Sequence, residues 1–241
     1  MQLRAAARLI LSITSLALFA STTALAQETK PDQAQTFRVG AKSIVLPSPS
    51  ADLVETGPDY RVLLEPLAPT TNRLAAAFVP PDGLLSLHSG AFKPMTNYAL
   101  VETFRTAEFT DIDPALFKEI CDGVGQQFGD GSFDATLKDQ EAEMNHKLKE
   151  LNSASATVTL DKVLQLGSFF NKPNAAGFGM IMPISTKDTT VKLVTSVTVL
   201  RVHDRVLFTY LCAIYKDENT VLALRKTAEQ WADAILKANP Q

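Results

Sequence analysis

Two consecutive apolar stretches in the last quarter of the chain constrain its fold more than any other feature. Val191–Val202 and Val206–Tyr215 are rich in Val, Thr, Leu, Phe and Tyr, and the polar tripeptide His203-Asp204-Arg205 separates them. Such runs on either side of a short polar turn predict an antiparallel hairpin. In the later strand both alternating sets of side chains are largely apolar, so we expect the sheet to be covered on both faces.

Two further strands are predicted immediately before this hairpin. Lys162–Phe170 and Gly177–Ile184 are joined through the turn residues Asn171-Lys172-Pro173-Asn174, which makes four consecutive strands of a meander. Gly177 and Gly179 interrupt the second of these strands. Glycine within a strand marks a bulge or a close approach of another chain segment.

Helices are predicted on both sides of the meander. The last begins at Asp217 as N-cap and carries an apolar stripe that includes Trp231, which we expect to anchor it on the sheet. Asp113-Pro114 starts a helix towards Phe128, and the highly charged Leu137–Leu151 forms another. Earlier strands are expected at Ser43–Leu46, Arg73–Val79 and Tyr98–Phe104, with short helices at Tyr60–Leu67 and Leu84–His88.

The order of these elements predicts an α+β fold. We expect an antiparallel sheet with a C-terminal four-stranded meander, flanked by helices as an α/β/α sandwich. Residues 41–241 contain no repeat and no long linker, so they are predicted to form one domain.

The N-terminal segment predicts export. Arg4 and Arg8 precede the uncharged stretch Leu9–Ala26, which ends in Ala24-Leu25-Ala26, and these are the three parts of a signal peptide spanning residues 1–26. A retained membrane anchor is the alternative, because the stretch approaches the roughly 17–25 residues needed to span a bilayer. Residues 27–40 are expected to be a flexible leader, and the mature protein to be soluble in the periplasm or outside the cell.

Charge and cysteine content limit the partners and the redox chemistry. The formal net charge is −3 and no block of Lys and Arg occurs, so we expect no nucleic-acid partner. Cys121 and Cys212 are the two cysteines. Export permits a disulfide between them, whereas their positions in apolar runs favour free thiols in the core.

Three groups of acidic residues could be interpreted as metal-binding sites, but none of them requires a metal ion. Asp111-Ile112-Asp113 could contribute two ligands to a cation, but capping of a helix accounts for Asp113. Asp130 and Asp134 do not follow the spacing of a calcium loop. Glu143-Met144-Asn145-His146 has the spacing of carboxylate-bridged metal sites, yet a solvated helix face with Glu143 paired to Lys147 explains it as well.

The sequence gives little support for nucleotide binding or for nucleophilic catalysis. Gly123, Gly125, Gly129 and Gly131 follow a helix and lack the lysine of a phosphate loop, so they indicate a helix end and a turn. His88 and Ser89 are adjacent, an arrangement that rarely makes a base and nucleophile pair. The sequence therefore predicts no catalytic, cofactor-binding or metal-binding residue.

Aromatic and methionine side chains of the meander leave a ligand pocket open as an alternative to core packing. They could line a cavity for an apolar small molecule, although tight packing in the core is the default explanation. The residues concerned are Phe169, Phe170, Phe178, Met180 and Met182.

The region Lys162–Lys237, with its meander followed by a helix containing Trp231-Ala232-Asp233-Ala234-Ile235, resembles the PsbP/Mog1-like α/β/α sandwich. The segment Asn72–Pro80 resembles one in exported bacterial proteins of unassigned function. PsbP-like proteins are mostly noncatalytic accessories of assemblies on a membrane surface. The resemblance therefore implies a noncatalytic binding or assembly accessory with a protein partner and no cofactor. An apolar small-molecule carrier and a carboxylate-based hydrolase are the alternatives.

Overall fold

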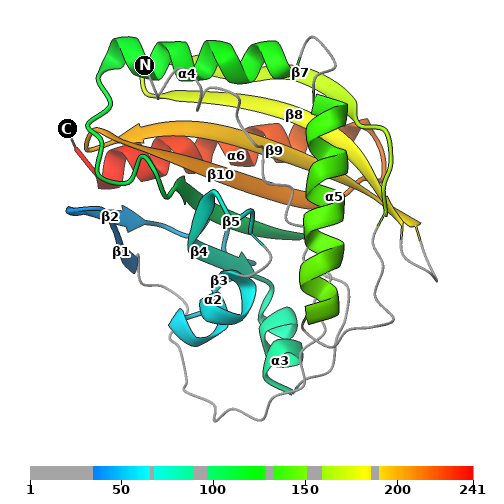
Figure 1. Cartoon of the computed structure of the whole chain (residues 1–241). Coiled ribbons are helices and arrows are strands. Elements are labelled where there is room, and N and C mark those ends of the chain that lie inside the picture. Colours follow the sequence, from blue (N-terminus) through cyan, green and yellow to red (C-terminus); the bar gives the residue numbers. More distant parts are fainter. Residues whose placement is uncertain are drawn as a thin grey trace.

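The computed structural model describes most of the chain after the N-terminal segment. It covers residues 35–65, 68–89, 97–128, 133–150, 159–185 and 190–240. Residues 1–34, which hold the predicted signal peptide and most of the predicted leader, lie outside this part. Strands and helices alternate in the first half of the chain, and four long strands and a helix form the end (Figure 1).

An eight-stranded antiparallel sheet organises the protein, and its strands follow the order β3-β4-β5-β10-β9-β8-β6, with β7 also paired to β8. The predicted meander is confirmed, because β7 through β10 pair in succession. Strand β10 lies at the centre, where β5 from the first half of the chain pairs with its other edge. The bounds are β3 (Val54–Glu55), β4 (Asn72–Val79), β5 (Asn97–Phe104), β6 (Thr159–Leu160), β7 (Leu164–Lys172), β8 (Ala175–Ser185), β9 (Thr190–Val202) and β10 (Arg205–Ile214).

The turn between β9 and β10 is shorter than predicted. It contains His203 and Asp204 alone, with φ of 48° and 62°, whereas Arg205 already pairs with Val202. Two positive φ values give a turn whose twist matches that of the flanking strands, which is why two-residue loops of this kind join long hairpins. Asp tolerates this backbone region better than most residues.

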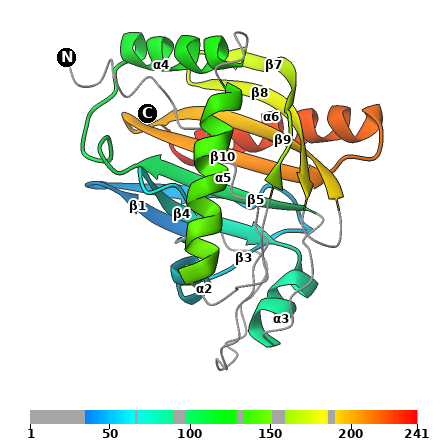
Figure 2. The same ribbon diagram turned by 45° about the vertical axis from the view of Figure 1, so that its right-hand side comes forward.

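Helices cover both faces of the sheet, as the sequence predicted (Figure 2). On β10, Phe208, Tyr210 and Cys212 belong to one core, while Leu207 and Leu211 belong to the other. Helices α4 (Pro114–Gln127) and α5 (Phe133–Glu150) contribute side chains to the first core, and α6 (Glu218–Ala238) to the second. The fold is therefore an α+β sandwich. Two shorter helices, α2 (Pro58–Leu64) and α3 (Pro81–Ser89), lie near the N-terminal strands.

Helix α6 begins and packs as expected. Asp217 caps it by accepting a hydrogen bond from the Thr220 backbone N–H, within a capping box. Trp231 is 2% exposed, meets the Phe78 ring edge to face at 5.8 Å, and donates its indole N–H to the Pro47 carbonyl at 2.8 Å. Asp233 pairs with Lys172 of β7, which ties this helix to the edge of the sheet.

Asn239, directly after α6, holds a separate two-stranded hairpin of β1 (Gln35–Val39) and β2 (Lys42–Leu46). Its side-chain amide accepts from the Val45 N–H at 2.8 Å and donates to the Val45 carbonyl at 2.7 Å. The amide thus bonds both backbone groups of Val45, in the way that a residue of an adjacent strand would. A third bond reaches the Ile235 carbonyl. Because Asn239 is 2% exposed, these bonds are shielded from water.

Asn239→Asp is expected to destabilise the fold by about 1–3 kcal/mol, because a carboxylate cannot donate to Val45 and Ile235 and remains buried among acceptors. Chemical denaturation of the two proteins measures the difference. The exposed substitution Lys237→Ala is the matched control at the same helix end. Equal stability of wild type and Asn239→Asp would show that the hairpin is held by apolar packing alone.

The glycines of β8 have the close contacts predicted for them. A Cβ at Gly179 would lie closer than 3.0 Å to the Phe169 ring, and one at Gly177 equally close to the Phe170 ring. Both rings come from β7, whose pairing with β8 is irregular at this place. The two phenylalanines therefore cover bare backbone and complete the core beneath α6.

One expectation needs correction, and the favoured state of the cysteines is confirmed. The segment 27–40 was predicted to be a flexible leader, but its last part forms strand β1. Phe37 and Val39 alternate with polar residues of this strand, and both are buried in the core that α6 covers. The two cysteines are not bridged: Cys121 lies in α4 and Cys212 in β10, and both are free. Burial raises the pKa of Cys121 to about 12 and that of Cys212 to about 11, so both thiols stay protonated at neutral pH.

Candidate functional site

Several turns meet at one end of the sandwich and form what we call the loop tip. It comprises residues 105–113 before α4, the β1–β2 turn at Gly40 and Ala41, the β9–β10 turn at His203 and Asp204, and residues 239–240. Loops placed on a rigid scaffold are where binding residues concentrate. His203 connects its own turn to residues 239–240 and to the start of β2, since its ring nitrogens lie 3.2 Å from the Pro240 carbonyl and 3.3 Å from the Ser43 carbonyl.

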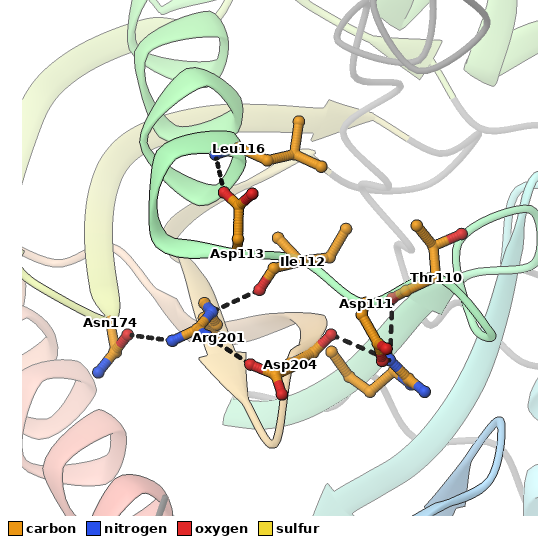
Figure 3. Close-up of polar contacts among 9 residues, drawn as sticks. Thr110, Asp111, Ile112, Asp113, Leu116, Asn174, Arg201 and Asp204 are labelled. Atoms are coloured by element: carbon orange, nitrogen blue, oxygen red, sulfur yellow. Dashed lines mark hydrogen bonds and ion pairs between the residues drawn. The ribbon is translucent and has the colours of Figure 1, made fainter.

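Arg201 fastens residues 105–113 to the sheet. It is the last residue but one of β9 and is 8% exposed, an unusual burial for an arginine. Its Nε donates to the Ile112 carbonyl at 2.5 Å, and its two terminal nitrogens bind the side chains of Asn174 and Asp204 (Figure 3). The backbone adds a bond from the Ile112 N–H to the Asp204 carbonyl at 2.9 Å.

Arg205 makes a second set of contacts from the other side of the turn. It is 4% exposed, and its Nη1 donates to the carbonyls of Thr110 and Asp204 and to the Asp111 carboxylate at 2.5 Å (Figure 3). This hydrogen bond, together with the positive charge, lowers the pKa of Asp111. Asp111 therefore stays ionised, which suits an ion pair and not a general acid.

Asp113 caps α4, as predicted, by accepting from the Leu116 N–H at 2.8 Å. The carboxylates of Asp111 and Asp113 thus serve an arginine and a helix end. Among the described residues, no group of three or more His, Cys, Asp or Glu side chains could hold a metal ion.

Phe109 is the most exposed large apolar side chain of the described residues, with 75% of its surface open to solvent. Its turn is nevertheless held firmly. The Thr110 N–H donates to the Ala107 carbonyl, Glu108 pairs with Arg73, and Arg205 binds the Thr110 carbonyl. On one side the turn touches Gly40, where a Cβ would overlap the Glu108 carbonyl oxygen. An aromatic ring thus stands on a backbone fixed from several sides.

The Glu-x-x-His pattern of α5 has a structural use. Glu143 accepts a hydrogen bond from the Thr70 N–H at 3.0 Å. This contact accounts for a glutamate at position 143 without the expected ion pair to Lys147. Two positions earlier, Glu141 accepts from the Leu160 N–H of β6 at 2.7 Å. His146 is exposed. These two carboxylates attach a charged helix to the segment before β4 and to β6.

The remaining candidates do not assemble into a site. Gly123 and Gly125 lie within α4, and a Cβ at Gly125 would meet the Phe178 ring at an ordinary contact distance. His88 and Ser89 end α3. Gly129, Asp130 and Gly131 lie outside the described residues.

The apolar pocket that the sequence left open as an alternative to core packing is not formed by these residues, because they divide between the two cores. Phe178, Met180 and Met182 face α4 and α5, whereas Phe169 and Phe170 lie under α6. All five are at most 9% exposed. Side chains on opposite faces of one sheet cannot line a common cavity, so core packing explains them.

Carboxylates suited to hydrolysis are not brought together among the described residues. Asp111 and Asp204 are each engaged by an arginine. Glu102 of β5 accepts from the Asn72 side chain at 2.8 Å, but it has no exposed surface that a substrate could reach. The arrangement resembles structural pairing more than an acid and base pair.

Sequence reasoning missed Arg201, Arg205 and Phe109. A signal was present for Arg201, since it interrupts an apolar strand beside the hairpin turn, where a charge needs a partner. Arg205 lay in the predicted polar turn, where a charged residue is ordinary. Phe109 gave no such signal, because exposure of a single aromatic residue depends on what packs over it.

No family model and no curated protein matches this chain. Among solved structures, the Saccharomyces cerevisiae Ran-binding protein Mog1p matches with 13% identity and a TM-score of 0.32. A mutant of protein Mog1 matches with 14% identity and a TM-score of 0.34. Each comparison covers 86% of this chain and 94% of the other.

None of the described helices is long and apolar enough to cross a membrane. Helix α6, for example, has 21 residues, but charged side chains occur along its whole length beside the apolar stripe.

Proposed function

We propose that this chain is an exported, noncatalytic binding or assembly accessory that engages a protein partner through the loop tip. One observation carries the proposal: Phe109, 75% exposed, stands on a turn that hydrogen bonds and ion pairs already hold in place. Aromatic side chains are enriched among the few residues that dominate binding energy in protein interfaces.

The energetics favour such a residue as an anchor. Burying a phenylalanine side chain completely is worth about 1.5–3 kcal/mol. A partner that covers Phe109 would order little else, because Arg205 and Glu108 already fix the turn. A binding surface that is ordered in advance loses less entropy on association.

Export is supported by the sequence of residues 1–26 alone. The charged start, apolar stretch and Ala-x-Ala end predict removal of this segment and release into the periplasm, with the extracellular space as the alternative. N-terminal sequencing of the protein from its natural host decides between cleavage after Ala26 and a retained anchor. A mature chain beginning at Gln27 would support the proposal.

Phe109→Ala is expected to remove the partner while leaving the fold intact. Native purification of wild type, Phe109→Ala and Leu222→Ala, followed by quantitative mass spectrometry, measures this. Leu222 is the matched control, since it is 61% exposed on α6, away from the loop tip. We expect a stoichiometric partner with wild type and Leu222→Ala, and a loss of at least about tenfold with Phe109→Ala.

Two outcomes would contradict this function. Equal recovery of a partner with all three proteins would remove the loop tip as the docking surface. A bound small molecule in place of a protein would favour the carrier.

A further inference from the structure

A nearly buried carboxylate lies at the far edge of the sheet from the meander. Glu55 is the second residue of the two-residue edge strand β3, and its side chain is 4% exposed. The register places it opposite Phe78 of β4, so its surroundings on that side are apolar. Burying a charge in such a place is costly unless it is well paired.

The pairing of Glu55 is incomplete. One carboxylate oxygen accepts from the Gly57 N–H at 2.7 Å. The other, Oε1, lies 3.5 Å from Nε of Arg61, and both atoms are buried without a hydrogen-bond partner. Native proteins leave few buried polar atoms in this condition.

Arg61 connects this pair to two other elements, β4 and β1. It belongs to α2, donates through Nη1 to the Ala75 carbonyl of β4 at 2.7 Å, and stacks over the Phe37 ring of β1 at 4.9 Å. We call Glu55, Gly57, Arg61, Ala75 and Phe37 the Glu55 joint. Through it, α2, β1 and β3 are attached to the edge of the sheet.

We propose that the Glu55 joint is a proton-dependent latch, which stays closed when Glu55 is neutral and opens locally more often when Glu55 is charged. In the closed form the charged carboxylate lies among apolar side chains with one hydrogen bond and one loose ion pair. Local opening of α2 and β3 exposes it to water, where the charge is fully hydrated. Opening therefore relieves a cost that only the charged form bears.

The electrostatics give the direction of the effect. Burial raises the pKa of Glu55, and this outweighs the lowering by the Gly57 N–H and by Arg61. A carboxyl whose pKa is higher in the closed form binds its proton more tightly there. The closed form therefore gains stability as pH falls through this raised pKa and loses it as pH rises.

Few other groups can contribute to this dependence. Arg61 is the one charged side chain of the described residues that shifts the pKa of Glu55. On α2, Asp59 is exposed and acts on Tyr60, whose pKa is raised by burial and by that charge. Phe78 of β4 lies opposite Glu55, and Phe37 of β1 lies against Arg61; neither side chain titrates.

Hydrogen exchange of wild type and Glu55→Gln from about pH 4.5 to 7.5 tests the latch, after correction for the intrinsic pH dependence of exchange. Glutamine is neutral throughout and keeps an acceptor for Gly57. Near neutral pH we expect amides of residues 54–64 to be protected roughly three- to tenfold more in Glu55→Gln than in wild type. The difference should vanish at the acidic end, and α6 should exchange alike in both.

Equal protection of residues 54–64 in the two proteins near neutral pH would overturn the latch. So would lower protection in Glu55→Gln at every pH, because the charged pair would then stabilise the closed form. The wild-type series provides a second criterion that needs no variant: protection of residues 54–64 relative to α6 must rise as pH falls. Partner binding at Phe109 does not enter either measurement, so failure here leaves the proposed function untouched.

Discussion

Arg201→Ala is expected to lower the free energy of unfolding by about 3 kcal/mol. The substitution removes hydrogen bonds to the Ile112 carbonyl, Asn174 and Asp204 from a site that is 8% exposed. Bonds from a charged donor are worth about 1.5–3 kcal/mol each, and the contributions within one network are not additive. Chemical denaturation followed by fluorescence of Trp231 measures the change.

Arg201→Lys distinguishes charge from geometry. A lysine keeps the positive charge, but its single ammonium cannot reach three acceptors placed around a planar guanidinium. We expect it to lose most of the stability that alanine loses. The exposed Lys118→Ala, which breaks an i,i+4 pair with Asp122, is the control and should change stability by less than about 0.5 kcal/mol. Wild-type stability of Arg201→Ala would show that the network does not hold residues 105–113.

Gly179→Ala is expected to destabilise the fold by about 1–3 kcal/mol, through overpacking. The added methyl group would overlap the Phe169 ring, which is 4% exposed and packed beneath α6. The ring cannot move away freely, because it is enclosed by the packed core that α6 covers. Thermal and chemical unfolding of the purified variant give the size of the loss.

A double-mutant cycle identifies the cause. If the overlap is responsible, Gly179→Ala should cost much less in a Phe169→Ala background, where the space is empty. Gly125→Ala in α4 is the matched control, since its Cβ would meet Phe178 at an ordinary 3.4 Å and alanine favours the helix. Additive effects of Gly179→Ala and Phe169→Ala would rule out the ring contact.

Most of the fold could be predicted because its signals are local. Each of the patterns that were used spans only a short stretch of sequence. They are the alternation of apolar side chains in β10, the N-caps Asp113 and Asp217, and the apolar stripe of α6. The two-sided covering of the sheet followed from β10 alone. The position of β5 beside β10 did not, because pairing between strands distant in the sequence leaves no periodic signal.

The candidate site was much less predictable. Asp111 was considered as a cation ligand, and its real partner, Arg205, is 94 positions away. Phe169 and Phe178 were grouped as possible pocket residues, and an irregular pairing of β7 with β8 placed their rings on opposite faces. A shift of one residue in register exchanges the two faces of a strand, and sequence alone does not reveal it.

The sequence by itself determined the long strands of the sheet, the helices and the N-caps Asp113 and Asp217, since side-chain periodicity and backbone preference act over a few neighbouring positions. Only the tertiary structure decided which charges meet at Arg201 and Arg205, that Phe109 remains uncovered, and that Glu55 is buried beside Arg61. The physical reason is that burial and ion pairing depend on segments far apart in the chain, whose mutual position is set by the packing of the whole sandwich.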